Sequence, residues 1–421
     1  MQANFFKNNR AELLKRIKDN SIVVLFAGNA PKKTADESYQ FTPNRNFYYS
    51  TGVSEESHIL LMSKINGIEK STLFIKDIDE ELERWNGKSI RKEEASEISG
   101  VDEVKFNSQF DGEIHRLLFL KEEVNLYLDL ERDRIISSSS IANEFAKNMV
   151  SKYPQVMIKN IFSIFGELRL VKSEEEIDNI RKAISITIEG IEALMKNAKA
   201  GMKEYELEAY FDFVCKSNGV KDLAFKTIAA AGKNAATLHY VANDAQLNDG
   251  DLIQFDLGAQ YKFYNADISR AFPVNGKFTD RQKDVYNAVL KVNEEIINSI
   301  KPGITFKEVN KKATDLIAEE CIRLGLIKDK SEVSKYYFHS IGHSLGLDTH
   351  DLETPNRDIT FKEGVVYTVE PGIYIEEENI GIRIEDDILV TKDGIINLTS
   401  AMIKTVEEIE SFMSENNKNI K

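Results

Sequence analysis

The sequence predicts an α/β protein of two domains, and two observations support that prediction. In residues 1–165, short apolar runs alternate with amphipathic stretches, which is typical of a mixed α/β domain. In residues 166–421, long helical stretches alternate with runs of β-forming residues, and this order occurs twice. A chain of 421 residues has room for two or three domains.

Composition narrows the class of protein. Apolar residues make up 42% of the chain and charged residues 29%, as expected of a globular protein in water. The net charge of −14 disfavours nucleic acids and anionic membranes as partners, because both attract basic surfaces. Charges run through Met1–Asn20 and no window approaches the length of a membrane span, so we expect neither a signal peptide nor a transmembrane helix. Cys215 and Cys321 lie in helical, largely apolar stretches and are predicted to be buried thiols, which fits a cytoplasmic location.

The N-terminal domain is predicted over residues 1–165. Apolar runs rich in β-formers predict strands at Ile22–Ala27, His58–Met62, Ser71–Ile75 and Val124–Leu128, and amphipathic stretches predict helices at Glu12–Lys18, Gln109–Phe119 and Ser140–Met149. The only tryptophan, Trp85, precedes Asn86-Gly87 and is predicted to lie in a turn. An exposed aromatic residue of this size often marks a contact surface. No cluster of catalytic residue types stands out in this domain.

The C-terminal domain is predicted over residues 166–421, and its helices have clear starts. Three Ser or Thr residues are each followed three positions later by Glu or Gln, the spacing of a capping box. The pairs are Ser173 with Glu176, Thr279 with Gln282, and Thr305 with Glu308. Apolar residues then recur at helical spacing, so a helix is predicted to begin at each pair. A further helix is predicted from about Lys203 to Ser217, and strands are predicted over 224–273 and from 336 onward.

This domain repeats its own pattern. Lys199-Ala200-Gly201-Met202 corresponds to Lys301-Pro302-Gly303-Ile304, and each segment lies between two predicted helices. In each half a glycine precedes an apolar strand that ends in an acid, and a second acid follows. The corresponding residues are Gly250 and Gly364, Asp256 and Glu370, and Asp267 and Glu385. Such self-similarity indicates an internal duplication, and two halves packed about a pseudo-twofold axis would bring the equivalent acids face to face.

The segment from Asp256 to Asp267 is predicted to be a β-hairpin. An apolar run ends in Asp256, aromatic residues precede Asp267, and Gly258 is expected to provide the positive φ of a tight turn. The hairpin would bring the two carboxylates together, and buried carboxylates repel each other unless a cation neutralises them. The alternative is a solvated turn with ordinary surface acids.

Four of the six histidines fall in the C-terminal domain: His239, His339, His343 and His350. The spacing of His339 and His343 is that of a helical zinc site, but the zinc-protease helix requires Glu where this chain has Ser340. Gly342 and Gly346 would each destabilise a helix by about 1 kcal/mol. We therefore predict a loop or strand end whose histidines point into a site. The alternative is a loop with three unrelated histidines.

Two further acids complete the candidate site. Glu370 ends one predicted strand, and Arg383, Glu385 and Asp387 alternate along another, so that they share one face. A buried acid needs a cationic partner, which is either a metal ion or Arg383. A simple salt bridge of Glu385 is therefore the alternative to metal binding.

The predicted ligand set is Asp256, Asp267, His343, Glu370 and Glu385. Four carboxylates and one imidazole suit a pair of divalent ions, which we predict to be Mn²⁺, with Co²⁺ or Zn²⁺ as alternatives. Two such ions held about 3.5–4 Å apart generate a bridging hydroxide and polarise a carbonyl group. The remaining histidines would bind the substrate and stabilise the oxyanion, so the predicted chemistry is hydrolysis of an amide bond.

These residues resemble those of the pita-bread metallopeptidases, and in particular the aminopeptidase P (Xaa-Pro aminopeptidase) family, over nearly the whole chain. The resemblance implies a pita-bread catalytic domain with pseudo-twofold symmetry and a smaller, creatinase-like α/β domain before it. It implies that Asp256 and Asp267 hold one metal ion, and that Asp267, His343, Glu370 and Glu385 surround the other. Glu370 would also carry the proton of the bridging water.

The same resemblance assigns the residues around the ligand set. His239, His339 and His350 resemble the histidines that face the substrate in this family, and Tyr374 and Arg383 resemble its supporting residues. The segment from Arg45 to Gly52 is similar to the start of the family's N-terminal domain. Arg84-Trp85-Asn86-Gly87 resembles a segment whose Trp reaches into the substrate site of a neighbouring subunit, which implies a homodimer or a dimer of dimers. Thr349 and Ser340 stand where the family usually has Val or Ile and often has Gly.

The implied activity is metal-dependent release of the N-terminal residue from peptides with proline in the second position. An Xaa-Pro dipeptidase (prolidase) is the alternative, because it shares the ligands and the histidines; the Trp85-Asn86-Gly87 segment favours the aminopeptidase. A third possibility is a non-catalytic pita-bread protein that binds peptide, histone or RNA partners. Such proteins typically lose metal ligands, whereas all five are present here.

Overall fold

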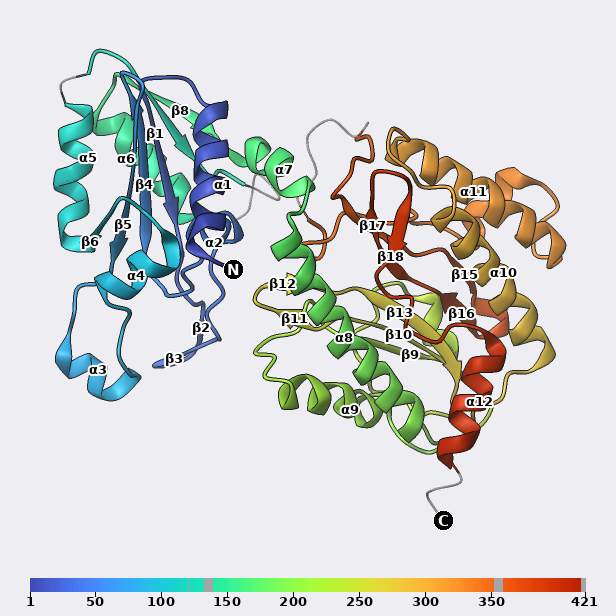
Figure 1. Ribbon diagram of the computed structural model, residues 1–421. Coiled ribbons are helices and arrows are strands. Elements are labelled where there is room, and N and C mark those ends of the chain that lie inside the picture. Colours follow the sequence, from blue (N-terminus) through green and yellow to red (C-terminus); the bar gives the residue numbers. More distant parts are fainter. Residues whose placement is uncertain (120, 132–138, 352–358, 418–421) are drawn as a thin grey trace. The chain divides into compact units, whose positions relative to one another are not determined.

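The structure is a computed structural model that describes residues 1–119, 121–131, 139–351 and 359–417 (Figure 1). The chain forms two compact units, Met1–Leu168 and Arg169–Lys421. Among the described helices, none is both long and apolar enough to span a membrane.

The first unit is built on one mixed sheet of six strands. The strands are β1 (Ser21–Phe26), β4 (Ile59–Ile65), β5 (Ile68–Ile75), β6 (Glu103–Phe106), β7 (Val124–Leu128) and β8 (Val156–Asn160). Their order is β6-β5-β4-β1-β7-β8, so β1 is central, antiparallel to β4 and parallel to β7. The residues of β1 are almost entirely buried, as expected of an apolar strand covered on both faces.

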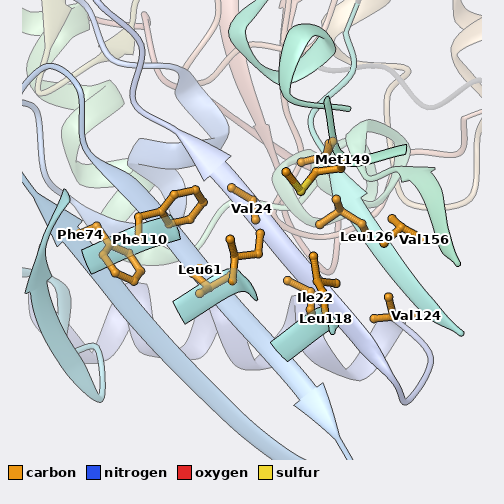
Figure 2. Close-up of a cluster of buried hydrophobic side chains, with 12 residues drawn as sticks. Ile22, Val24, Leu61, Phe74, Phe110, Leu118, Val124, Leu126, Met149 and Val156 are labelled. Atoms are coloured by element: carbon orange, nitrogen blue, oxygen red, sulfur yellow. The ribbon is translucent and has the colours of Figure 1, made fainter. Parts of the chain in front are cut away.

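Helices and a small hairpin surround this sheet. They are α1 (Ala3–Arg16), α2 (Arg45–Thr51), α3 (Glu80–Asn86), α4 (Lys92–Ser99), η1 (Asn107–Gln109), α5 (Phe110–Leu118), α6 (Ile141–Lys152) and α7 (Phe162–Leu170), with the hairpin strands β2 (Lys32–Thr34) and β3 (Glu37–Ser38). Figure 2 shows the core beneath α5 and α6, where Phe110 and Leu118 meet Ile22, Leu61 and Leu126. Burial of each such side chain contributes about 1.5–3 kcal/mol, which fixes these helices on the sheet.

The strands and helices predicted in this region are all present, although α1 begins earlier than predicted. The prediction of a turn at Trp85 is wrong, because Trp85 lies in α3. The Asp79 carboxylate accepts the backbone N–H groups of Glu81 and Leu82 and starts this helix, which ends at Gly87 with φ 89°. None of the residues of α3 is buried, and Trp85 is 82% exposed, as expected of a contact residue.

In the second unit the helices are α8 (Glu174–Asn197), α9 (Glu204–Ser217), η2 (Gly232–Ala236), α10 (Asp280–Ile297), α11 (Phe306–Arg323), η3 (Lys330–Lys335), η4 (Glu376–Glu378) and α12 (Val406–Asn417). All three predicted capping boxes are confirmed. The side chains of Ser173, Thr279 and Thr305 each accept the backbone N–H group of the third helical residue. The side chain of that third residue in turn accepts the backbone N–H group of the capping residue. The predicted apolar stripe of α10 is buried, and so is that of α8 except for the half-buried Ile188.

The strands of the second unit are β9 (Ile228–Ala231), β10 (Leu252–Leu257), β11 (Gln260–Tyr261), β12 (Tyr264–Asn265), β13 (Ile268–Pro273), β14 (Val366–Val369), β15 (Gly372–Ile375), β16 (Ile380–Arg383), β17 (Asp386–Val390) and β18 (Ile395–Asn397). Two three-stranded sheets have the orders β13-β10-β9 and β14-β17-β18, and β11-β12 and β15-β16 form two hairpins. We call residues 174–273 the first half and residues 280–390 the second half.

Backbone hydrogen bonds confirm the predicted duplication. The N–H group of Gly201 donates to Leu247 O at 2.8 Å, and that of Gly303 donates to Phe361 O at 2.9 Å. These glycines have φ angles of 94° and 95°. The N–H group of Leu247 returns a bond to Met202 O, and that of Phe361 returns one to Ile304 O, each at 2.8 Å. The two halves therefore have the same backbone plan at this connection.

The predicted hairpin is present, but its turn was predicted at the wrong residue. β10 and β13 pair antiparallel, with Asp256 opposite Ser269. The positive φ angles occur at Lys262 and Phe263, between β11 and β12, and not at Gly258. Glycine is needed at position 258 for a different reason, because a Cβ atom there would lie 1.8 Å from Ala266 O. The close approach of the two strands, rather than a turn, requires this glycine.

Candidate active site

The two halves of the second unit meet where their strands end. The N–H group of Glu385 donates to Ser269 O at 3.1 Å, and that of Arg383 donates to the side-chain oxygen of Gln254 at 2.7 Å. β10 and the start of β13 thus face β16 and the residues that follow it. Asp256 and Asp267 enter this seam from the first half, and Glu370 and Glu385 enter from the second.

Three of the predicted ligands form a tight cluster in the seam. Asp267, His343 and Glu385 each offer one ligand atom, and these atoms all lie within 4.8 Å of one another. His343 Nε2 lies 3.5 Å from Asp267 Oδ2 and 3.6 Å from Glu370 Oε1. Among the described residues, Asp256 and Glu370 are not members of that 4.8 Å group. Asp256 instead accepts a hydrogen bond from Arg383 Nη2 at 2.5 Å.

Crowding of the acids strongly perturbs their protonation. Burial and the charge of Glu385 raise the pKa of Asp267 well above its usual value, and burial and the charge of Glu370 do the same for Glu385. Burial and Asp256 raise the pKa of Glu370 to about 8, although Arg383 opposes this. Asp256 Oδ1 is buried and has no hydrogen-bond partner in the described part of the chain. An unpaired buried oxygen among unneutralised carboxylates fits a site for divalent cations.

His343 is held in the form that binds metal ions. Burial and the neighbouring His350 lower the pKa of His343 to about 4, so its ring is neutral at neutral pH. The Nδ1 atom lies 3.2 Å from Ser344 O, which leaves Nε2 directed at the carboxylates. The backbone N–H group of His343 donates to Thr368 Oγ1 at 3.1 Å, which ties the residue to β14.

Arg383 organises the other side of the seam. Besides its bond to Asp256, Arg383 donates from Nη1 to the Tyr374 hydroxyl at 3.1 Å and from Nε to Ser269 Oγ at 2.8 Å. Ser269 Oγ in turn donates to Glu385 Oε2 at 2.8 Å. The alternative in which Arg383 forms a direct salt bridge with Glu385 is therefore wrong. The guanidinium group pairs with Asp256 and reaches Glu385 through Ser269.

Sequence reasoning missed Ser269. It follows Asp267 by two positions in an extended segment, so alternation places both side chains on one face. The same alternation is confirmed in the second half, where Asp387 Oδ2 accepts the N–H group of Asp267 at 3.2 Å. The intervening Asp386 points the other way, to Arg270 at 2.7 Å.

The remaining histidines surround the cluster. The segment from His339 to His350 contains no helix, as predicted. His339 Nε2 lies 2.9 Å from the Tyr374 hydroxyl, and burial together with Arg383 lowers the pKa of His339 to about 4. His239 is exposed, yet its charge contributes to that lowering, which places it near His339. The rings of His343 and His350 are 4.3 Å apart. Trp85 belongs to the first unit.

The fold and a cluster of residues that could hold a metal ion are those expected of a metallopeptidase, and comparison with known proteins agrees. Residues 178–392 match metallopeptidase family M24, and residues 6–127 match the aminopeptidase P N-terminal domain. The chain belongs to metallopeptidase family M24. The predicted resemblance and the pita-bread fold that it implied are thereby confirmed.

Individual relatives point to one branch of this family. The chain is 32% identical to the Xaa-Pro aminopeptidase of Escherichia coli (strain K12) over 434 residues, covering 97% of each protein. A solved structure from Bacillus anthracis assigned as an aminopeptidase P has 49% identity and a TM-score of 0.97 over 100% of both chains. A zinc-substituted E. coli aminopeptidase P in complex with product has 31% identity and a TM-score of 0.91 over 99% of both chains.

Proposed function

We propose that this protein is a metal-dependent Xaa-Pro aminopeptidase, which releases the N-terminal residue from peptides with proline in the second position. The observation that carries the proposal is the cluster of Asp267, His343 and Glu385, whose ligand atoms lie within 4.8 Å of one another between the two halves. The names of the relatives supply the substrate class, since Xaa-Pro aminopeptidases match almost the whole chain. They favour this activity over that of a prolidase or a non-catalytic binding protein.

The five predicted ligands are proposed to hold two divalent ions. Asp256 and Asp267 would hold one ion, and Asp267, His343, Glu370 and Glu385 the other. Such ions lower the pKa of a bound water and polarise a carbonyl group. Carboxylates with one imidazole favour hard or borderline ions, and we propose Mn²⁺, with Co²⁺ or Zn²⁺ as alternatives. Elemental analysis of protein purified from cells, followed by activity after exchange of each metal, tests this assignment.

The protein's own groups would position the peptide and move protons. The Glu370 carboxylate lies 3.6 Å from His343 and 3.9 Å from His339, a position from which it would accept a proton and return it. Neutral His339 donates its single N–H from Nδ1 to Ser340 O at 2.7 Å and accepts the Tyr374 hydroxyl at Nε2, so it would orient Tyr374 toward the substrate. Arg383, fixed by three side chains, would keep Asp256 and Tyr374 in place.

His239 and His350 are proposed to bind the substrate at the exposed side of the cluster. Both are exposed, whereas the ligands are buried or half-buried. Their rings would contact the peptide on either side of the bond to be cleaved. His239→Ala and His350→Ala are expected to raise KM for Xaa-Pro peptides while the bound metal is retained. Loss of the metal from either variant would contradict a substrate-binding role.

Peptide length separates the proposed activity from that of a prolidase. An aminopeptidase of this type releases Xaa from a tripeptide Xaa-Pro-Xaa, whereas a prolidase cleaves Xaa-Pro dipeptides alone. The test is a panel of matched dipeptides, tripeptides and longer peptides with the metal-loaded protein. Hydrolysis of tripeptides supports the proposal, and hydrolysis confined to dipeptides contradicts it. Bound metal without hydrolysis of any peptide would favour a binding protein.

We further propose that the protein is a homodimer or a dimer of dimers, with oligomer contacts in residues 1–165 and catalysis in residues 166–421. The support is α3, where Leu82 and Trp85 lie one helical turn apart and are 54% and 82% exposed, while Ile78, just before the helix, is 44% exposed. Trp85 would reach the substrate site of a neighbouring subunit. Trp85→Ala should raise KM, and light scattering measures the assembly. The proposed cytoplasmic location agrees with two buried, unpaired cysteines, and cell fractionation tests it.

A further inference from the structure

The geometry points to a positioning function for a buried ion cluster formed by Arg169, Lys172 and Asp351. We propose that this cluster fixes the loop that carries His343 and His350 and so sets the position of His350 toward the substrate. The inference rests on the proposed function, because it concerns a histidine assigned to the substrate. It names residues outside the ligand set, and none of the three is itself placed against the reacting atoms.

The Asp351 carboxylate accepts ionic hydrogen bonds from both cations. Arg169 Nη2 donates to Asp351 Oδ1 at 2.5 Å, and Lys172 Nζ donates to Asp351 Oδ2 at 2.9 Å. Each of the three side chains is at most 2% exposed. Arg169 also contacts Asp348 at 2.6 Å. Burial alone would lower the pKa of Arg169, but the charges of Asp351 and Asp348 outweigh burial and raise it, so the cation is maintained.

The Asp351 carboxylate is packed beneath the histidine loop. Asp351 directly follows His350 in the sequence, and the backbone N–H group of Asp351 donates to Ser344 O at 2.9 Å. The loop leaves no room for a side chain at Gly346, where a Cβ atom would lie 2.3 Å from Asp351 Oδ2. This arrangement closes the loop on itself between His343 and His350. The orientation of the carboxylate therefore determines the path of the backbone on which His350 is mounted.

Arg169 and Lys172 lie in a segment, residues 169–176, that also contacts the hairpin between Asp256 and Asp267. Lys172 is followed by the start of α8, where the buried carboxylate of Glu176 accepts a hydrogen bond from the Tyr264 hydroxyl at 3.0 Å. The histidine loop and the hairpin also contact each other directly, since Asn265 donates from its backbone to Gly346 O at 2.9 Å. Residues 169–176 thus contact both the histidine loop and the hairpin that contains β12.

Ion pairs in this position are better suited to positioning than apolar contacts are. Removing two charges from water is unfavourable, and apolar residues of similar size often stabilise a core equally well. Ionic hydrogen bonds are short and directional, however, so they define the direction of the Asp351 carboxylate in a way that apolar packing does not. We infer that Arg169 and Lys172 serve to define the direction of the Asp351 carboxylate.

A double-mutant cycle tests the proposal on the metal-loaded, full-length protein. Asp351→Asn should lower kcat/KM for an Xaa-Pro-Xaa tripeptide by about ten- to a hundredfold, as typically follows loss of a partner that orients a functional group. Metal content should be unchanged. In the His350→Ala background the same substitution should change kcat/KM by less than about twofold, because the residue that it positions is already absent.

A matched control separates positioning from general loss of stability. Glu320 is also buried and accepts bonds from two cations, Lys291 at 2.8 Å and Arg323 at 2.6 Å, but it lies on α11. Glu320→Gln should lower the melting temperature and leave kcat/KM unchanged. If Asp351→Asn does not fold, Lys172→Met takes its place, and Lys172→Arg should restore most of the lost kcat/KM.

Two outcomes would overturn the inference. Full kcat/KM in folded Asp351→Asn would do so, as would additive losses in the double variant. A readout independent of activity is the NMR signal of the His350 ring in protein loaded with diamagnetic Zn²⁺, which should shift in Asp351→Asn but not in Glu320→Gln. An unshifted ring would contradict the positioning role even if no peptide were hydrolysed. Absence of hydrolysis by the unmodified protein would instead contradict the proposed function.

Discussion

Residues 174–273 and 280–390 of the second unit use one backbone plan twice, and they differ in the side chains that they bring to the seam between them. The first half contributes Asp256, Asp267 and Ser269, which are acidic or neutral. The second half contributes acids as well, but also Arg383 and the histidine loop. The shared backbone bonds at Gly201 and Gly303 show that the scaffold is alike even where the chemistry is not.

The difference arises in the connections. In the first half, β10 and β13 are joined by the short hairpin β11-β12, whereas the second half inserts the longer hairpin β15-β16, which carries Tyr374 and Arg383. The histidine loop, likewise, lies in the second half between α11 and β14. A duplicated scaffold therefore supplies matching acids, and the connections of the second half supply the predicted imidazole ligand, His343, and the guanidinium group of Arg383. Loops on a rigid scaffold commonly carry function in this way.

If the site is shared by the two halves, it needs ligands from both. Substitution of one predicted metal ligand from either half should therefore have the largest effect on activity. Asp267→Ala removes a ligand of the first half and His343→Ala one of the second. Each should lower kcat/KM by about a hundredfold or more and reduce bound metal, because metal ions contribute several kcal/mol to catalysis. Asp315→Ala, on the exposed face of α11, is the control. An active variant with full metal content would contradict a shared site.

The equivalent glycines Gly258 and Gly372 should differ in whether their substitution lowers the stability of the fold or the catalytic rate. A Cβ atom at position 258 would lie 1.8 Å from a backbone oxygen, whereas one at position 372 would lie 2.4 Å from the Tyr374 hydroxyl. Gly258→Ala should therefore destabilise the fold by about 3 kcal/mol or more. Gly372→Ala should mainly displace Tyr374 from His339 and lower kcat. Denaturation and kinetics on both variants check this, and equal stabilities would contradict it.

Ser269 is the first-half residue that links Arg383 to Glu385 of the second half. Ser269→Ala removes both hydrogen bonds and should lower kcat/KM by about ten- to a hundredfold, as expected for a partner that orients a ligand. Ser50→Ala is a suitable control, because Ser50 is also buried but its hydroxyl donates to the carbonyl of Asn46 in a helix of the first unit. Equal kinetics for the two variants would refute the linking role.

The acids that both halves bring together should make the metal-free protein sensitive to pH. The pKa of Glu370 is raised to about 8, so the folded state keeps a proton that the unfolded state releases near pH 4.5. Stability from this group is therefore lost as pH rises through about 8. The lowered pKa values of His339 and His343, about 4, act in the opposite direction but only below about pH 6.5.

Between pH 6.5 and 8 the proton on Glu370 alone should accordingly account for a loss of about 2 kcal/mol in the stability of the metal-free protein, since one pH unit corresponds to about 1.4 kcal/mol per proton. Saturating Mn²⁺ should remove most of this dependence, because the ions replace the protons on the carboxylates. Thermal unfolding with and without metal at both pH values is the measurement. A gain in melting temperature with metal that is no greater at pH 8 than at pH 6.5 would be inconsistent with crowded acids.

The smallest predicted difference concerns the starts of α9 and α11, which are equivalent helices. Thr305 accepts the N–H group of Glu308 and caps α11, whereas Lys203, at the matching position of α9, has no side-chain acceptor. Thr305→Ala should lower stability by about 1 kcal/mol, and Lys203→Ala should have almost no effect. Neither should alter kcat/KM. Comparable losses from the two substitutions would show that the halves are capped alike.

Much of this organisation could be predicted from sequence where one local rule decides the structure. The capping residues Ser173, Thr279 and Thr305 determine where helices begin, and period-two alternation placed Arg383, Glu385 and Asp387 on one face. The duplication was visible because its acids and glycines keep their spacing. These signals depend on near neighbours in the chain, so a single sequence contains them.

Contacts across the seam were not predictable in the same way. Whether Arg383 pairs with Glu385 or with Asp256 depends on how the two halves pack, and the structure selects Asp256. Gly258 was assigned to a turn because glycine is common in turns. The structure shows instead that the carbonyl of Ala266 leaves no room for a side chain at position 258. Trp85 was placed in a turn because Asn86-Gly87 follows it, but the cap at Asp79 starts a helix first.

Acids from both halves are proposed to hold a pair of divalent ions. Anomalous diffraction from crystals of the Mn²⁺-loaded protein, recorded at the manganese edge, tests it most directly. We predict two peaks about 3.5–4 Å apart, bounded by Asp256, Asp267, His343, Glu370 and Glu385. A map with no peak there, or with peaks bound by one half alone, would contradict this account.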